Sequence, residues 1–318
     1  MYEQFFGLKE RPFELTPDPR YLVLTESHLE VLENLEYGIG TRKGMTLLVG
    51  EAGSGKTTVI RAAIARQPGK VHYVHLHNPT LTRAEFVEML ASHFNLSEAA
   101  SRSKTRMLLE LERTFLERRS RGEVTALVID EAQSLPLELL EEIRLLANIE
   151  TNSEKLMTVI IAGQPELADR LNNPNLRQFK QRVGLRCELR PLTATETAAY
   201  IAGRIRTAGG AGAQVFTRES VAVIYRHSKG LPRVISVIAD NALLGGFAAG
   251  QRPVGSDIVR EVCRDFDLQA ALLEASRYDA PPPPVEPASA PTRRNQINAA
   301  ALFGAFAATR KRLSVLWN

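Results

Sequence analysis

The sequence predicts an α/β fold, in which a parallel sheet of five strands is covered by helices on both faces and is followed by a small helical domain. Three observations support this prediction. Up to about residue 192, short apolar runs alternate with helical patterns, as in parallel sheets. Beyond that point only helical patterns follow one another. With 318 residues, 44% of them hydrophobic, the chain is long enough for about two domains.

Five apolar runs predict the strands, at residues 45–50, 70–76, 125–130, 156–163 and 184–189. A first helix is expected after Ser27, a candidate N-cap with Glu30 three residues on. Amphipathic patterns then predict helices at residues 56–67, 82–93, 104–120 and 136–148. Four further helices are expected within residues 193–206, 217–228, 231–249 and 255–266.

These elements divide the chain into five parts. Residues 1–44 form an N-terminal segment, residues 45–192 the α/β core and residues 193–268 the helical domain. The stretch "PPPPVEPASAPT" marks residues 269–292 as a proline-rich linker, and residues 293–318 form a basic tail.

The tail accounts for the basic character of the chain. The net charge is +4, and residues 293–318 contain five basic and no acidic residues. The remainder is therefore close to neutral and does not predict a general nucleic-acid surface. In the tail, one helical face would join Leu302, Phe306, Leu313 and Trp317. Such a helix binds an anionic membrane surface or a partner's groove; a disordered terminus is the alternative.

The chain carries few signals for a compartment. Cys187 and Cys263 lack metal-like spacing and fit a reducing compartment without disulfides. The start "MYEQFFGLKERPF" does not resemble a signal peptide, and no uncharged apolar run reaches the ~18 residues of a membrane span. We therefore expect a cytoplasmic location.

The stretch "GEAGSGKT" between the first strand and the next helix has the spacing G-x-x-x-x-G-K-T of a phosphate-binding loop. Glycines let backbone N–H groups close on an anion, and the helix N-terminus adds positive partial charge. Lys56 would bind the β- and γ-phosphates, and Thr57 would supply a hydroxyl to Mg²⁺. The predicted nucleotide-binding residues are Gly50, Glu51, Ala52, Gly53, Ser54, Gly55, Lys56, Thr57 and Thr58.

The third strand, in "ALVIDEAQSL", ends in two acids. Asp130 would hold Mg²⁺ together with Thr57, and Glu131 would orient and deprotonate water. A carboxylate directed at water favours a hydrolase. A small-molecule kinase is a rival, although the sequence has no separate signal for a second substrate pocket.

For three further groups of polar residues, the sequence allows both a functional and a purely structural role. Gln164, after the fourth strand, would reach the attacking water or would only cap the helix in "PELADRL". Arg182, or in second place Arg177, would act on a neighbouring subunit's γ-phosphate, or would only be solvated. In "HYVHLH", His75 and His77 share one side of a strand, but no third ligand accompanies them, so ordinary strand histidines are favoured over a metal site.

The turn "SKGLPRV" separates two helices of the second domain. Gly230 would end one helix in a left-handed conformation, and Pro232 would open the next, where no N–H is needed. Arg233 would then point across the cleft at the γ-phosphate. A plain connector with a surface arginine is the alternative.

Together, the phosphate loop, "VIDEAQ", "GQPEL", the arginine-rich helix and "GLPR" resemble an AAA+ ATPase, a P-loop NTPase fold whose C-terminal helical domain is called the lid. The opening "YEQFFGLKERPFELTPDPRYLVLTESHLEVLENLEYGI" is similar to that of the general secretion pathway protein A, or ExeA-type, ATPases, relatives of pilus- and exosortase-associated ATPases. The resemblance covers about residues 1–268.

The resemblance implies ATP and Mg²⁺ between core and lid, an N-terminal stretch near the adenine, and a homo-oligomer. It implies Arg233 as a lid sensor and Arg182 as a catalytic arginine acting between subunits, beside Lys56, Thr57, Asp130 and Glu131. Secretion members of the family carry a transmembrane helix and a peptidoglycan-binding domain after the lid, where this sequence has the proline-rich linker and the basic tail.

We therefore expect an ATPase that drives conformational change or assembly in a cell-envelope secretion, pilus or polysaccharide-export system. It would be cytoplasmic or peripheral at the inner membrane through its tail. A DNA-binding AAA+ ATPase of the transposition-regulator type is the rival, against which the near-neutral body and the ExeA-like opening weigh.

Overall fold

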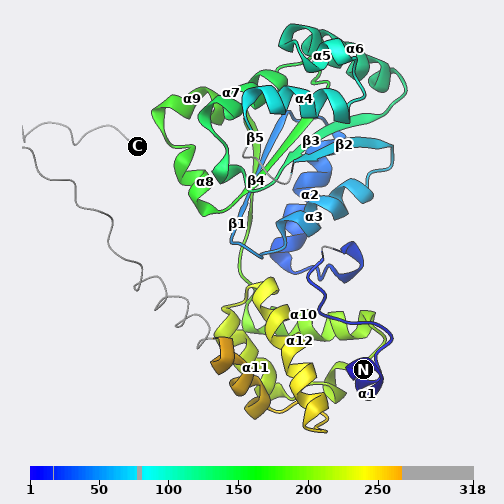
Figure 1. Cartoon of the computed structure of the whole chain (residues 1–318), viewed down its shortest axis with the longest axis vertical. Helices are drawn as coiled ribbons and strands as arrows, with labels where there is room; N and C mark the ends of the chain where they lie inside the picture. The colour runs from blue at the N-terminus through cyan, green and yellow to red at the C-terminus, as the bar shows by residue number, and fades with distance from the viewer. Residues whose placement is uncertain (17, 77–80, 267–318) are drawn as a thin grey trace, which may run out of the picture. The chain divides into compact units, whose positions relative to one another are not determined.

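The computed structural model describes residues 1–16, 18–76 and 81–266. An α/β core comes first along the chain and a helical domain follows (Figure 1). The proline-rich linker, the basic tail and His77, for which the sequence analysis makes predictions, lie outside the described residues. Within the described ranges, no helix combines the length and the apolar character needed to cross a membrane.

The five-stranded parallel sheet predicted from the apolar runs is confirmed. Its order is β2-β3-β4-β1-β5, and every neighbouring pair is parallel. The strands are β1 (Met45–Gly50), β2 (Val71–Leu76), β3 (Val124–Ile129), β4 (Thr158–Gly163) and β5 (Val183–Leu189). Parallel strands end at one edge of a sheet, where α/β proteins bind ligands. This order therefore brings the loops after β1, β3 and β4 together.

Helices cover both faces of the sheet, because alternate strand residues point to opposite faces. On one face, Leu47 and Leu127 join an apolar cluster with Phe86 and Phe115. On the other, Leu48 packs in a second cluster. The first face is covered by α4 (Arg83–His93), α5 (Glu98–Ser101), α6 (Lys104–Ser120), α7 (Leu137–Leu146), α8 (Pro165–Arg170) and α9 (Arg177–Lys180), and the second by α2 (Glu26–Gly40) and α3 (Lys56–Ala65).

The predicted cap of α2 is wrong by two residues. Thr25, not Ser27, precedes the helix, and its hydroxyl accepts a hydrogen bond from the backbone N–H of His28. Ser27 instead accepts one from the N–H of Arg190, which follows β5. Both residue types are good caps, and the contact between Ser27 and Arg190 cannot be seen in the local sequence.

The helical domain contains α10 (Ala194–Thr207), α11 (Arg218–Ser228), α12 (Pro232–Ala248) and a helix that occupies residues 256–266. The short N-terminal helix α1 (Tyr2–Phe6) lies beside α12 (Figure 1). Tyr2, Phe6 and Phe13 are buried in the apolar core of this domain. The predicted N-terminal segment is therefore divided: its first 13 residues belong to the helical domain, and α2 belongs to the core.

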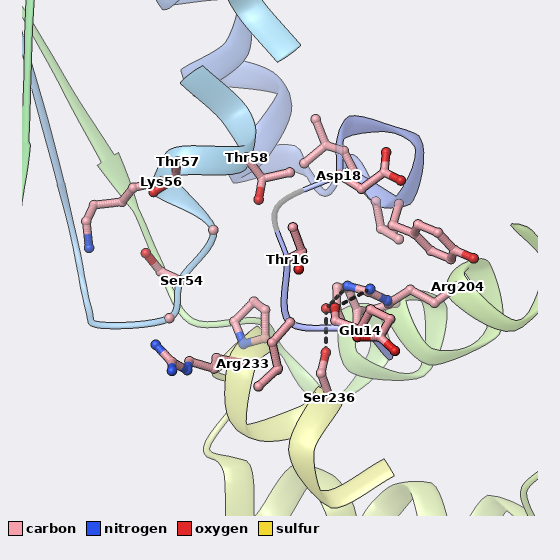
Figure 2. A pocket seen from close by; sticks show the side chains of 18 of the residues that line it. Glu14, Thr16, Asp18, Ser54, Lys56, Thr57, Thr58, Arg204, Arg233 and Ser236 are labelled. Atoms are coloured by element: carbon pink, nitrogen blue, oxygen red, sulfur yellow. Dashed lines mark hydrogen bonds between the residues drawn. The ribbon is translucent and has the colours of Figure 1, made fainter. Parts of the chain in front are cut away.

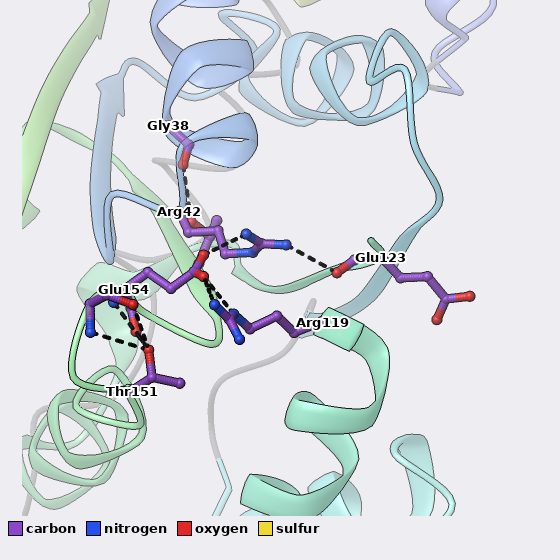
Figure 3. A network of polar contacts seen from close by, with 8 residues as sticks. Gly38, Arg42, Arg119, Glu123, Thr151 and Glu154 are labelled. Atoms are coloured by element: carbon purple, nitrogen blue, oxygen red, sulfur yellow. Dashed lines mark hydrogen bonds and ion pairs between the residues drawn. The ribbon is translucent and has the colours of Figure 1, made fainter. Parts of the chain in front are cut away.

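A polar network closes the end of the sheet opposite the candidate site (Figure 3). Glu154, in the loop before β4, pairs with Arg42 at 2.7 Å and with Arg119 at the end of α6. Arg42 also donates to the carbonyl of Glu123 at 3.4 Å, and Thr151 accepts from the N–H of Glu154 at 3.2 Å. A shared network of this kind stabilises more than an isolated surface pair. It ties the turns before β1, β3 and β4 together.

The turn between α11 and α12 joins the helical domain to the core. Lys229 ends α11 in the left-handed conformation (φ 51°), and Gly230 follows with φ 77°. The left-handed turn therefore begins one residue before the predicted glycine. Gly230 accepts a hydrogen bond from the N–H of Leu192 at 2.9 Å, and a Cβ at Gly230 would lie 2.0 Å from the Leu192 carbonyl oxygen. Only glycine fits this approach.

Replacing Gly230 with alanine is expected to destabilise the protein by at least about 3 kcal/mol, because strain at positive φ adds to a clash with backbone. Gly250→Ala is the matched control, since Gly250 also has positive φ (63°) but open space around its Cβ position. It should cost about 1 kcal/mol. Urea unfolding followed by circular dichroism measures both; equal destabilisation would show that contact with Leu192 does not matter.

Candidate functional site

The phosphate loop joins β1 to α3, as its motif predicts. Gly53 and Gly55 adopt left-handed conformations, with φ 77° and 101°. Gly53, Ser54, Gly55, Lys56, Thr57 and Thr58 line a pocket of about 350 Å³ (Figure 2). Gly50, Glu51 and Ala52 belong to the loop but do not line the pocket. The buried hydroxyl of Ser54 has no hydrogen-bond partner among the described residues, as expected of a loop shaped for an added anion.

Lys56 is almost fully buried at the first position of α3. Its ammonium group donates to the carbonyl oxygens of Gly50 at 2.9 Å and Glu51 at 3.1 Å. Burial lowers its pKa, while the carboxylates of Glu131 and Asp130 act in the opposite direction. Both acceptors are neutral, and no ion pair with Lys56 occurs among the described residues, so its positive charge is suited to attract phosphate.

Asp130 follows β3 and contacts the phosphate loop directly. The Thr57 hydroxyl donates to its Oδ2 at 2.5 Å, and the N–H of Glu131 donates to its Oδ1 at 3.1 Å. His75 on β2 lies behind it, with Nε2 3.8 Å from Oδ2. Burial acts to raise the pKa of Asp130, but the neighbouring His75 and the hydrogen bonds from Thr57 and the Glu131 N–H outweigh it, and the pKa is lowered. The carboxylate therefore stays ionised at neutral pH.

The donors at this point fit a magnesium ion carried by a nucleotide. Mg²⁺ is usually held by one or two carboxylates together with substrate phosphates and water. Thr57 and Asp130 supply one hydroxyl and one carboxylate, joined to each other. No cluster of three or more His, Cys, Asp or Glu side chains suited to a metal occurs among the described residues, so a cage made only of protein is not found there.

Glu131 is held from two sides by amides. Its backbone is left-handed (φ 51°, ψ 36°), which is uncommon outside glycine. The side-chain amide of Gln133 donates to its Oε2 at 2.6 Å, and that of Gln164 donates to the same oxygen at 3.2 Å. Gln133 in turn accepts from the N–H of Gln164 at 3.1 Å. The carboxylate is thus fixed at the wall of the pocket, which it lines.

Gln164 is predicted either to reach the attacking water or the γ-phosphate, or only to cap the next helix. It does not line the pocket, so contact with water or phosphate stays a prediction. Its position precedes α8, but its side chain makes no capping bond there. The side chain reaches Glu131 instead. Gln133 was missed in the sequence, although it lies in the quoted "VIDEAQ"; a polar residue two positions after the acid is too common a feature to indicate a role.

Arg233 lies at the start of α12, after Pro232 at the first helical position. Its N–H donates to the carbonyl of Gly53 at 3.1 Å, and its side chain lines the pocket. Figure 2 shows the guanidinium on the side of the phosphate loop. A Cβ at Gly53 would lie 2.5 Å from the Cβ of Arg233, so this glycine also permits the contact between core and helical domain.

The end of the pocket away from the phosphate loop is made by the N-terminal segment and the helical domain (Figure 2). Its lining includes Glu14, Leu15, Thr16, Tyr21, Tyr200, Arg204 and Ser236. None of the three helical-domain residues has a recognisable motif, so sequence reasoning missed them. His28 also lines the pocket; its imidazole Nδ1 bonds Thr25 Oγ1 at 2.8 Å, and burial lowers its pKa.

Arg182 and Arg177 lie away from the pocket. Both are exposed, Arg177 at the start of α9 and Arg182 between α9 and β5. Neither lines the pocket of its own chain. Their predicted action on a neighbouring subunit stays a prediction.

Comparisons with known proteins agree with this arrangement. Residues 39–171 match a family model described as an AAA domain. The chain is 38% identical over 255 residues to the general secretion pathway protein A of Aeromonas hydrophila. The aligned region covers 80% of this chain and 46% of that protein. The chain thus spans about half the length of this relative.

Solved structures show the same fold. The Aeropyrum pernix ORC2 protein, in ADPNP-ADP complexes, has a TM-score of 0.62 at 15% identity, covering 81% of this chain and 72% of that chain. A Walker-type ATPase of Pyrococcus abyssi has a TM-score of 0.56 at 17% identity, covering 84% and 80%. At these identities the likeness concerns the fold alone. Residues 39–171 match an AAA domain, and the chain is similar to general secretion pathway protein A over 80% of its length.

Proposed function

We propose that the chain binds ATP with Mg²⁺ between the core and the helical domain and hydrolyses it. The observation that supports this most is the arrangement after β3: Asp130 bonds to Thr57 of the phosphate loop, and the next residue, Glu131, is held at the pocket wall by two glutamines. A metal-binding pair and a fixed carboxylate base are the groups that hydrolysis of a phosphoanhydride needs.

Each residue has a defined part in this reaction. Bound Mg²⁺ supplies charge neutralisation on the phosphates. Lys56 binds the β- and γ-phosphates, and Thr57 with Asp130 holds the ion. Glu131 accepts a proton from the water whose oxygen attacks the γ-phosphorus, while the bond from that phosphorus to the β-phosphate oxygen breaks. Gln164 and Gln133 orient Glu131, and Arg233 stabilises the charge on the γ-phosphate from the helical domain.

The same contacts suggest how turnover is coupled to movement. Arg233 touches the phosphate loop through its backbone and lines the pocket with its side chain. A γ-phosphate that Arg233 binds would favour the closed arrangement of helical domain and core, and loss of that phosphate would release it. We propose that this switch drives assembly or conformational change in a homo-oligomer, with Arg182, or else Arg177, acting on the neighbouring subunit.

The proposed cellular setting is based on the relative rather than on the site. General secretion pathway protein A is named for secretion, and we propose that this chain serves a cell-envelope secretion, pilus or polysaccharide-export system from the cytoplasm or the inner-membrane surface. Salt-sensitive binding to DNA that stimulates hydrolysis would instead favour the transposition-regulator type.

Release of inorganic phosphate distinguishes hydrolysis of ATP from transfer of its phosphate to an acceptor. The purified chain with Mg²⁺ and ATP should release inorganic phosphate without any added acceptor, and chelating the magnesium with EDTA should stop the release. Malachite-green detection of phosphate measures this. Phosphate transfer that requires an added small-molecule acceptor would contradict the proposal and support a kinase.

A further inference from the structure

The wall of the pocket away from the phosphate loop is built around a buried arginine. Arg204 on α10 is only 8% exposed. Its guanidinium donates to the carbonyl oxygens of Pro12 at 2.5 Å and Glu14 at 3.0 Å, and to the hydroxyl of Tyr200 at 2.7 Å. Figure 2 shows its side chain extending from α10 toward Glu14. All three acceptors are neutral, and within the described ranges no carboxylate forms an ion pair with it.

Aromatic rings surround the same guanidinium. Its Cζ lies 4.8 Å from the centre of the Tyr21 ring, 5.4 Å from that of Tyr200 and 6.0 Å from that of Phe13. Tyr200 continues the chain of contacts, since its hydroxyl lies 2.9 Å from that of Ser236 on α12. Stacking with hydrogen bonding in a fixed plane is a property of arginine that lysine lacks.

These contacts hold an N-terminal segment, residues 12–16, against the helical domain. Phe13 is buried in the core of that domain, and the carbonyls on either side of it are held by Arg204. The segment then continues into Leu15 and Thr16, which line the pocket. We call residues 12–16 the base wall. Two of its carbonyls are anchored on α10 by Arg204.

Residues 14–16 of the base wall line the pocket at the end away from the phosphate loop (Figure 2). The phosphate loop forms one end of the pocket and holds the phosphates. Thr16, Tyr21, Arg204 and Ser236 line the other end. The phosphate loop and Arg204 thus line different ends of the same pocket (Figure 2).

We propose that Arg204 is a positioning residue that fixes the base wall to the helical domain and thereby sets affinity for, and selection of, the nucleotide base. This rests on the proposed nucleotide binding and extends it. Arg204 need not touch the base: it holds the main chain of residues 12–14 in place through two carbonyls, while Tyr200 and Ser236 hold Arg204 and α12 together. Each closure of the helical domain would then bring the base wall along.

The test compares ligands with and without a nucleoside. Isothermal titration calorimetry gives the affinities of the full chain for ADP, GDP and inorganic pyrophosphate. Arg204→Gln should weaken ADP binding about 10- to 100-fold, reduce the difference between ADP and GDP, and change pyrophosphate binding less than about threefold. Arg204→Lys should not rescue ADP binding, since one ammonium cannot make the planar set of contacts. KM for ATP should rise with kcat at saturation nearly unchanged.

Two further variants serve as a control for the change of charge and as a milder change in the same contacts. Arg206→Gln changes an exposed arginine on the same helix and should behave like wild type. If Arg204→Gln does not fold, Tyr200→Phe removes only the hydroxyl between Arg204 and Ser236 and should shift ADP affinity in the same direction, about 3- to 10-fold. Equal loss of ADP and pyrophosphate binding, or unchanged ADP binding, would overturn the role of Arg204. A wild-type chain that binds neither ligand would contradict the proposed function itself.

Discussion

Glu131→Gln is expected to lower kcat for ATP hydrolysis by about 10²- to 10⁴-fold, the usual contribution of a positioned general base. The amide has nearly the same shape as the carboxylate but cannot accept a proton from water. Affinity for ATP should stay within about threefold, because Lys56, Thr57 and Asp130 are untouched. Phosphate release at saturating ATP, together with calorimetric titration of ATP, measures the two effects separately.

The amides around Glu131 make this variant informative. Gln133 and Gln164 both donate to its Oε2, so one amide oxygen of the new glutamine can still be held in place. Glu138→Gln, on the exposed start of α7, makes the same chemical change away from the pocket and should leave kcat unaltered. Normal phosphate release by Glu131→Gln would mean that another group takes the proton.

Lys56→Ala is expected to weaken nucleotide binding by about 100-fold, roughly 3 kcal/mol, as when one partner of a buried charge contact is removed. Hydrolysis should fall below detection at ATP concentrations that saturate wild type. Alanine suits the first turn of α3, so the fold should remain. Calorimetry with ADP measures the affinity, and the exposed Lys43→Ala, which also removes one lysine, is the control. Unchanged ADP affinity would place the phosphates elsewhere.

The same variant tests the proposed action between subunits. A Lys56→Ala subunit should not hydrolyse ATP detectably but still offers Arg182 to a neighbour, whereas an Arg182→Ala subunit keeps its own pocket. Mixtures of the two should therefore recover part of the activity that each lacks alone. If no ratio of the two recovers activity, the arginine that acts in trans is not Arg182.

The strands and the loops after them could be predicted because their signals are local. The three central strands β1, β3 and β4 are short, fully buried apolar runs, and the phosphate loop has fixed spacing between β1 and α3. Asp130 and Glu131 follow directly from the end of β3. A parallel sheet then forces these loops to one edge, which is why the structure joins Thr57 to Asp130 without any further signal in the sequence.

The parts that escaped prediction depend on contacts between distant residues. Arg204 meets the carbonyl of Pro12 across 192 positions, and an arginine within an amphipathic helix gives no sign of such a partner. The cap of α2 was likewise predicted at Ser27 instead of Thr25. The hydroxyl of Ser27 instead accepts a hydrogen bond from Arg190, 163 positions away, which local sequence does not reveal. The division of the N-terminal segment likewise follows from Phe13 packing among residues of the helical domain.

The central claim is that the pocket between core and helical domain hydrolyses ATP with Glu131 as the base. Its most direct test is the nucleotide recovered from the protein. Wild type and Glu131→Gln are incubated with Mg²⁺ and radiolabelled ATP for several turnover times, separated from free nucleotide by a rapid spin column, and the bound nucleotide is resolved by chromatography. The account predicts ADP on wild type and intact ATP, in similar molar amount, on Glu131→Gln. ADP on both proteins, or no bound nucleotide on either, would contradict it.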